Sequence, residues 1–330
     1  LEAGIVKNSK TKNNLTYADL TGAKLTALEA QISSPKKMDK ISPPNIKLKN
    51  LIKHYQTGHR DEAEKLAISM TQEFPEDQFA WKVLGALLSE TGRKIEALNA
   101  NQKSASLAPQ DAEAHNNLGN TLRELGRFDE AETSYRQALK LKSDYFSALY
   151  NLGITLQDLA RLEEAEASYM QALALKPDFV LAHCNLGNLL KEQGKLEEAE
   201  ALFRKALDLK PDFLAAYSNL GNTLQRLGRL KEALATYGHA IFLKPDFVEV
   251  HFNSGITLKK MGRLDEALAS YTRAIEIRPD YAEAHNNLGV TLQELGRLDE
   301  AESSLRQAIV LKHDFAEAHS NLGVTLKELG

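Results

Sequence analysis

Several features that would point to a familiar class of protein are scarce or missing in this sequence of 330 residues. A single cysteine, Cys184, excludes an intramolecular disulfide framework and fits a reducing compartment, so we expect a cytoplasmic protein. No apolar run approaches the roughly 20 residues of a membrane-spanning helix, and no signal-peptide hydrophobic segment follows the N-terminus. Phosphate-binding loops and dinucleotide-binding fingerprints are also missing, which argues against a nucleotide-dependent enzyme.

Positive charge is scarce outside the N-terminal region. Residues 1–60 hold 11 Lys and Arg against 4 Asp and Glu, whereas the remaining residues hold 30 against 41. A net acidic protein binds polyanions poorly, so we expect no nucleic acid partner. The basic start is either a solvated, loosely ordered arm or a segment that contacts an acidic surface. Within it, residues 15–31 fit a short amphipathic helix and residues 33–44 fit a linker interrupted by prolines.

What the sequence does contain is a period of 34 residues. Asn-Leu-Gly, or Asn-Ser-Gly in one copy, recurs with its glycine at Gly119, Gly153, Gly187, Gly221, Gly255, Gly289 and Gly323. When this glycine is numbered position 8, the repeats begin at residues 78, 112, 146, 180, 214, 248, 282 and 316. Glycine at position 15, with Ala160 as the exception, suits the left-handed end of a first helix. Acidic residues at positions 18 and 19 suit the start of a second helix, and proline at position 32 ends it.

These recurring positions resemble the tetratricopeptide repeat (TPR) family. The matching positions are Gly at 8, Ala at 20, an aromatic residue at 24, Ala at 27 and Pro at 32, and Trp81 occupies the family's aromatic position 4. The resemblance covers residues 44–330, with a degenerate repeat at 44–77 and a truncated one at 316–330, and it leaves out residues 1–43. It implies an all-α, right-handed superhelical solenoid of antiparallel helix pairs, with the first helices lining a concave groove. The period and the Asn-Leu-Gly motif are most similar to the TPR region of O-GlcNAc transferase-like and bacterial TPR-glycosyltransferase proteins.

The asparagine at position 6 is the candidate for binding. On a helical wheel, positions 3, 7, 11 and 14 form the packed face, and positions 2, 6, 9 and 13 form a second cluster about 125° away. An amide there can accept from a backbone N–H and donate to a backbone C=O, whatever the sequence of the bound peptide. An alternative is that this amide bridges neighbouring helices or persists from recent duplication. The candidate peptide-binding residues at position 6, which we call the Asn ladder, are Asn117, Asn151, Asn185, Asn219, Asn253, Asn287 and Asn321, and those at position 9 are Asn120, Asn188 and Asn222.

Acidic residues accompany the ladder at positions 2 and 13. Only Arg226 and Lys260 oppose them at these positions, so we expect a neutral-to-basic partner and no lysine clamp for a terminal carboxylate. A solvated face without a binding role is the alternative. The acidic residues are Glu90, Glu113, Glu124, Asp158, Glu192, Glu249, Glu283, Glu294, Glu317 and Glu328.

The residues that would carry chemistry do not form a catalytic or metal-binding pattern. Five histidines at position 4 lie one per repeat, not at the spacing of a metal site, so we interpret them as packing residues. Cys184 has no activating partner nearby on the helix face. We therefore expect no catalytic residues, no metal and no cofactor in this chain. The histidines are His115, His183, His251, His285 and His319.

The sequence therefore predicts a protein–protein interaction scaffold that binds extended polypeptide. Two alternatives stay open: part of a protein-modifying, glycosyltransferase-like enzyme whose catalytic domain follows residue 330, or a self-assembling scaffold. The chain starts at Leu1 without a Met, and the last repeat stops at its position 15, so we expect a piece of a longer protein.

Overall fold

The structure, a computed structural model, describes residues 43–330, which form seventeen α-helices and no strand. The all-α repeat fold expected from the sequence is confirmed. The segment before residue 43, with the helix expected at 15–31, lies outside the described residues.

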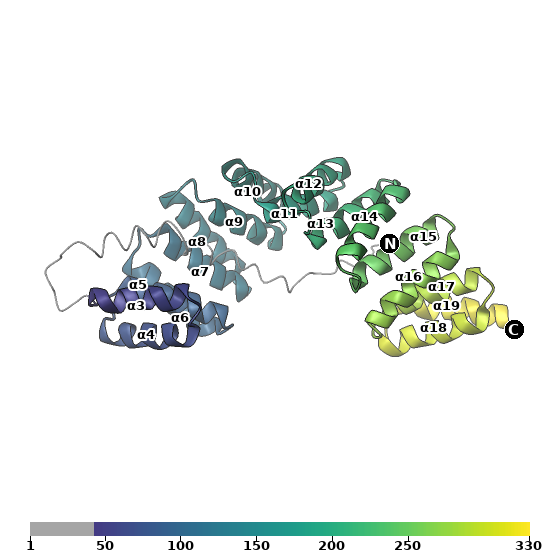
Figure 1. Cartoon of the computed structure of the whole chain (residues 1–330), viewed down its shortest axis with the longest axis horizontal. Coiled ribbons are helices and arrows are strands. Elements are labelled where there is room, and N and C mark those ends of the chain that lie inside the picture. The colour runs from purple at the N-terminus through teal and green to yellow at the C-terminus, as the bar shows by residue number, and fades with distance from the viewer. Residues whose placement is uncertain (1–42) are drawn as a thin grey trace. The chain divides into compact units, whose positions relative to one another are not determined.

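The chain divides into two compact units, one ending at Lys176 and the other starting at Pro177. Figure 1 shows the helices following one another as pairs within each unit. The helices of the N-terminal unit are α3 (Asn45–Gln56), α4 (Arg60–Glu73), α5 (Gln78–Glu90), α6 (Lys94–Leu107), α7 (Ala112–Glu124), α8 (Phe128–Leu141), α9 (Phe146–Asp158) and α10 (Leu162–Leu175). Those of the C-terminal unit are α11 (Val180–Glu192), α12 (Leu196–Leu209), α13 (Leu214–Arg226), α14 (Leu230–Leu243), α15 (Val248–Lys260), α16 (Leu264–Ile277), α17 (Ala282–Glu294), α18 (Leu298–Leu311) and α19 (Ala316–Leu329).

Odd-numbered helices are the first helices of the repeats and even-numbered helices are the second. Within each unit, each helix packs against the next one in the chain, and from α5 on a first helix also contacts the first helix of the following repeat in the same unit. Equivalent positions on successive first helices therefore lie on one side of each unit.

The turn at position 15 has the left-handed backbone that the glycines predict. Gly126, for example, has a φ of 75°, and the N–H of Arg127 donates to the carbonyl of Leu122 at 2.9 Å, which closes the end of α7. Ala160 adopts the same conformation at φ 58° with the same closing bond, from Arg161 to Leu156 at 2.8 Å. The repeat thus imposes this turn even where the sequence lacks the glycine.

Changing Ala160 to glycine should stabilise the N-terminal unit. An L-residue with a side chain pays about 1 kcal/mol in the left-handed region, and Ala160 is exposed, so a glycine loses no packing there. We expect a gain of about 0.5–1 kcal/mol in the free energy of unfolding, measured by thermal denaturation. The matched control is Gly194→Ala at φ 82°, which should lose a similar amount. An Ala160→Gly variant no more stable than the parent would contradict this account.

The core of each repeat forms where position 8 of the first helix meets position 24 of the second. Tyr135, Tyr169 and Tyr237 at position 24 are fully buried, and each lies against the position-8 glycine of its own repeat. Alanines at positions 20 and 27 are also fully buried, and their small size lets the helices approach closely.

Polar side chains at position 4 bond the turn that precedes their own first helix. All five histidines donate from Nε2 to the carbonyl six residues earlier, as His183 does to Pro177 at 2.8 Å and His251 to Pro245 at 2.9 Å. Trp81 makes the same bond from its indole N–H to the carbonyl of Pro75 at 2.8 Å. His183 and His251 are buried, as the interpretation of packing residues predicts, whereas His115 and His285 are half-buried and His319 is exposed.

Candidate functional site

The Asn ladder places one amide on each first helix from α7 to α19. Asn151 is buried, at 7% exposure, and the other six side chains are half-buried. The N-terminal unit carries two ladder members and the C-terminal unit carries five. In each unit the amides occupy equivalent positions on first helices that contact one another. The ladder is thus a row of amides that combines partial burial with access to solvent.

Two ladder amides bridge neighbouring helices. Asn151 donates from Nδ2 to Oδ1 of Asn116 at 3.4 Å, and Asn321 donates to Asn286 at 2.9 Å. Asn116 and Asn286 occupy position 5 of the preceding repeat and are 1% exposed. At these two positions the structure therefore matches the bridging alternative. The position-5 asparagines were not among the predicted residues, although their presence beside the ladder residue in the sequence was a signal.

Three consecutive ladder members in the C-terminal unit keep their donor groups available. Oδ1 of Asn219 accepts from Lys191 at 2.9 Å and Oδ1 of Asn287 accepts from Asn286 at 3.5 Å. Within residues 43–330, no protein acceptor is found for the side-chain NH₂ groups of Asn219, Asn253 and Asn287. A half-buried amide donor without a protein partner is suited to a ligand carbonyl.

Two of the position-9 asparagines accept hydrogen bonds from buried tyrosines of their own repeats. Oδ1 of Asn120 accepts from the hydroxyl of Tyr135 at 2.7 Å, and Oδ1 of Asn222 accepts from Tyr237 at 2.6 Å. Burial raises the pKa of Tyr135 to about 12, so its hydroxyl stays protonated and donates. The oxygens of these two amides are therefore committed to the core. The coincidence of Asn at position 9 with Tyr at position 24 was the sequence signal for this pair.

A row of long polar side chains at position 12 was missed by the sequence reasoning. Lys191 donates to Asn188 at 3.1 Å and to the ladder residue Asn219, and burial lowers its pKa to about 8. In the N-terminal unit, the buried Nε of Arg123 has no hydrogen-bond partner among the described residues. The sequence signal is an alternation with glutamine: the row reads Arg123, Gln157, Lys191, Gln225, Lys259, Gln293 and Lys327.

Five of the ten acidic residues that we predicted beside the ladder form ion pairs. In each pair, the carboxylate lies 2.5–3.4 Å from the nitrogen of a lysine or arginine. Together with the basic residues at position 12, these pairs make the strip mixed in charge rather than acidic. The pairs are Glu90–Arg60, Glu113–Lys82, Glu249–Arg278, Glu283–Lys312 and Glu294–Lys259.

An open depression of about 400 Å³ lies on the ladder side of the C-terminal unit. Asn287 and Ile256 line it, with Tyr271 beside them and the ion pair of Lys259 and Glu294 at its edge. An apolar surface next to an unused amide donor can hold a side chain while the amide binds the adjoining main chain.

The single cysteine, Cys184, is buried. Burial raises the pKa of the Cys184 thiol to about 12, which keeps it protonated. Among residues 43–330, no cluster of three His, Cys, Asp or Glu side chains could hold a metal ion. None of the described helices is long and apolar enough to cross a membrane.

Comparison with known proteins identifies the family. A profile described as TPR repeat matches residues 119–159, 158–194, 187–228, 257–296 and 293–330. Profiles described as tetratricopeptide repeat match residues 100–133 and 214–247. The chain therefore belongs to the tetratricopeptide repeat family. Arrays of this family are protein–protein interaction scaffolds with protein or peptide partners, and the fold is typically non-catalytic.

One match with a TM-score above 0.5 among solved structures supports the fold. The chain is similar to a chain of the APC/C hetero-tetramer Cut9–Hcn1, at 15% identity and a TM-score of 0.59, over 96% of this chain and 64% of that one. It is also similar to YrrB, described as a TPR protein with an unusual peptide-binding site, at 28% identity and a TM-score of 0.47, over 56% of this chain and 96% of YrrB. MamA matches at 25% identity and a TM-score of 0.48, over 50% of this chain and 97% of MamA. A search of curated proteins finds no match.

Proposed function

We propose that the ladder side of the first helices binds an extended polypeptide by its main chain. The observation that carries this proposal is the run of unused NH₂ groups on Asn219, Asn253 and Asn287, beside an open depression. One donor per repeat suits a ligand with regularly spaced carbonyls, and an extended main chain is such a ligand. We also propose that the Asn-Leu-Gly motif relates this chain to the repeat region of O-GlcNAc transferase.

Main-chain recognition supplies the larger part of the proposed affinity, and charge the smaller part. Each amide contact contributes about 0.5–1.5 kcal/mol, so several in register support micromolar binding. The preference for neutral-to-basic segments rests on acidic residues outside the five ion pairs, such as Glu192, Glu317 and Glu328. Basic residues of position 12 and at Arg226 and Lys260 offset them, so this preference should be small and should weaken with salt.

Replacing Asn219, Asn253 and Asn287 together with alanine should weaken peptide binding by more than about tenfold. Each lost amide removes about 1 kcal/mol, and about 1.4 kcal/mol is tenfold in affinity. Binders would be selected from a random-sequence displayed peptide library against the parent chain, and their dissociation constants measured by fluorescence anisotropy. Helicity should stay the same or rise, because alanine is the better helix former.

Two controls separate recognition from folding. Asn99, Gln171 and Gln307 are exposed amides on second helices, and their replacement with alanine should leave binding unchanged. Thioamide replacement of alternate peptide carbonyls in a selected binder should weaken binding, because sulfur accepts a hydrogen bond from the asparagine NH₂ groups less well than the carbonyl oxygen does. A folded ladder variant that keeps its affinity, or a thioamide peptide that binds as tightly as its parent, would refute the proposal.

A further inference from the structure

In three repeats, the arginine at position 16, at the start of the second helix, holds two carboxylates. At position 16, Arg161 binds Glu164 of its own repeat through Nε and Nη2, both at 2.7 Å. Its Nη1 binds Glu132, from position 21 of the preceding repeat, at 2.6 Å. Arg229 repeats the pattern in the C-terminal unit, with Glu232 at 2.7 and 2.6 Å and with Glu200 at 2.5 Å. Nη1 is thus the atom that receives a carboxylate from outside the arginine's own repeat.

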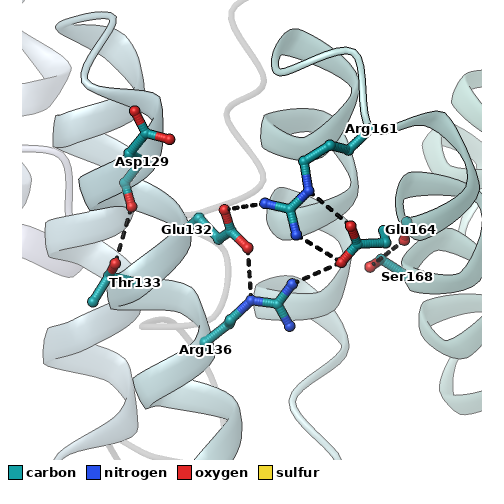
Figure 2. Close-up of polar contacts among 7 residues, drawn as sticks. All are labelled: Asp129, Glu132, Thr133, Arg136, Arg161, Glu164 and Ser168. Carbon is teal, nitrogen blue, oxygen red and sulfur yellow. Dashed lines mark hydrogen bonds and ion pairs between the residues drawn. The ribbon is translucent and has the colours of Figure 1, made fainter.

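Figure 2 shows this arrangement closing into a ring. Arg136, four residues after Glu132, binds Glu132 at 2.7 Å and Glu164 at 3.1 Å, so two arginines and two glutamates alternate. The second arginine is not essential to the pattern. Arg93 holds Glu64 through Nη1 and Glu96 through Nε and Nη2, and Ile68 stands where the ring would have its other arginine. One position-16 arginine therefore accommodates two carboxylates in this protein.

Among the described residues, no outer carboxylate bonds Arg127, Arg263 or Arg297, since position 21 of the preceding repeat is Leu98, Leu234 or Leu268. Of these three arginines, Arg297 also lines a cavity. Arg297 binds Glu300 through Nε and Nη2 at 2.7 Å, as its equivalents do. The preceding repeat, however, has Leu268 at position 21 and Thr272 at position 25. Within the described chain, no hydrogen bond or ion pair reaches Nη1 of Arg297, and Asp265 attracts its charge without forming an ion pair.

A cavity of about 330 Å³ opens at this place. Its floor includes Leu268 and Leu292, which are 8% and 4% exposed, and its rim includes Thr272, Ser304 and the Arg297–Glu300 pair. Leucine side chains, two serines and Arg297, whose Nη1 has no partner among the described residues, therefore line the same cavity. A glutamate side chain matches both features, since its methylene groups can cover the leucines while its carboxylate accepts from Nη1.

We propose that this cavity receives a glutamate side chain of a partner protein. The inserted carboxylate takes the place that Glu132 and Glu200 occupy beside Arg161 and Arg229. The site lies on α16, α17 and α18, is independent of the Asn ladder, and gives the scaffold a second contact selective for acidic segments. Because the ion pair is exposed, with the Arg297 side chain at 46% exposure, its contribution is to selectivity and falls with salt.

The test uses a minimal probe and arginine side-chain spectra of the full chain. N-acetylglutamate N-methylamide is titrated while the Nε–H signals of the arginines are followed by NMR. We expect a saturable shift of Arg297, at least about fivefold weaker binding of the neutral glutamine analogue, and no shift of Arg161, whose Nη1 is occupied. An equal response to the glutamine analogue, or no saturable shift at Arg297, would overturn the proposal.

Two variants place a competing carboxylate inside the site. Leu268→Glu should supply from within the group that Glu132 supplies to Arg161, and so abolish the response of Arg297 to the probe. Because Leu268 is buried, Thr272→Glu on the exposed rim is the second variant, and it should weaken the response at least about fivefold without loss of helicity. Thr272→Gln, of the same size and neutral, should keep the response. If both glutamate variants respond like the parent chain, the carboxylate site is not at Arg297.

Discussion

Replacing Gly221 with alanine is expected to destabilise the C-terminal unit, although alanine is the better helix former. A methyl group at this position would lie 2.7 Å from both Cδ1 and Cζ of Tyr237, which is closer than carbon atoms pack. The ring cannot swing away at low cost, because it is fully buried and its hydroxyl donates to Asn222 at 2.6 Å. Overpacking of this kind costs about 1–3 kcal/mol, and helix propensity returns at most about 1 kcal/mol. We expect a lower midpoint of thermal unfolding.

Replacing Gly323 with alanine should instead raise the free energy of unfolding. Gly323 occupies the same position 8, in α19, but an added methyl group there would meet no atom within 4 Å. Alanine should therefore raise stability by up to about 1 kcal/mol through helix propensity alone. Circular dichroism melts of the two single variants give the comparison. If both alanines stabilise the chain, close packing against position 24 is not the reason for the recurring glycine.

These glycines also show how much of the fold the sequence could predict. Positions 8, 15 and 32 recur because the helix contact, the left-handed turn and the helix end are each set within a single repeat. The 34-residue period therefore reveals these three positions in the sequence, and together they predict the helix pairs. Ala160 shows that the repeat dictates the turn even without its usual residue.

The candidate site was only partly predictable, because its amides differ in contacts that join neighbouring repeats. Asn151 and Asn253 both occupy position 6, yet Asn151 reaches Asn116 in the preceding repeat, whereas the equivalent of Asn116 for Asn253 is Ser218. A helical wheel treats one helix at a time and cannot separate these cases. The wheel also left position 12 outside the ladder cluster, and so Lys191 was overlooked even though it binds Asn219.

Replacing Lys191 with glutamine is expected to stabilise the C-terminal unit at neutral pH. Burial lowers the pKa of Lys191 from 10.5 to about 8, so the folded chain pays to keep this ammonium group charged below pH 8. That penalty is about 3 kcal/mol, and the two hydrogen bonds to Asn188 and Asn219, at about 0.5–1.5 kcal/mol each, offset about 1–3 kcal/mol of it. Glutamine is the residue at position 12 in three other repeats. We expect a net gain of up to about 2 kcal/mol.

The pH dependence of stability tests whether the charge on Lys191 is the cause of the destabilisation. Between about pH 8 and 10.5, the unfolded chain still binds the proton of Lys191 while the folded chain has released it, so the parent gains stability as the pH rises. The Lys191→Gln variant lacks this titrating group, so its stability should not rise in the same way. Its stability advantage over the parent chain should therefore shrink over this pH window. Lys327→Gln, at the exposed equivalent position in α19, should show no such trend when the midpoints of thermal unfolding are compared.

The stability cost of Lys191 is expected to accompany a role in peptide binding. Function often costs stability, and the half-buried Lys191 lies against the ladder amide of Asn219. If Lys191→Gln raises stability and also weakens the peptides selected on the parent chain, Lys191 belongs to the binding surface. A variant that is less stable at pH 7 would instead show that the hydrogen bonds of Lys191 outweigh the cost of burying its charge, and that the residue anchors α11 to α13.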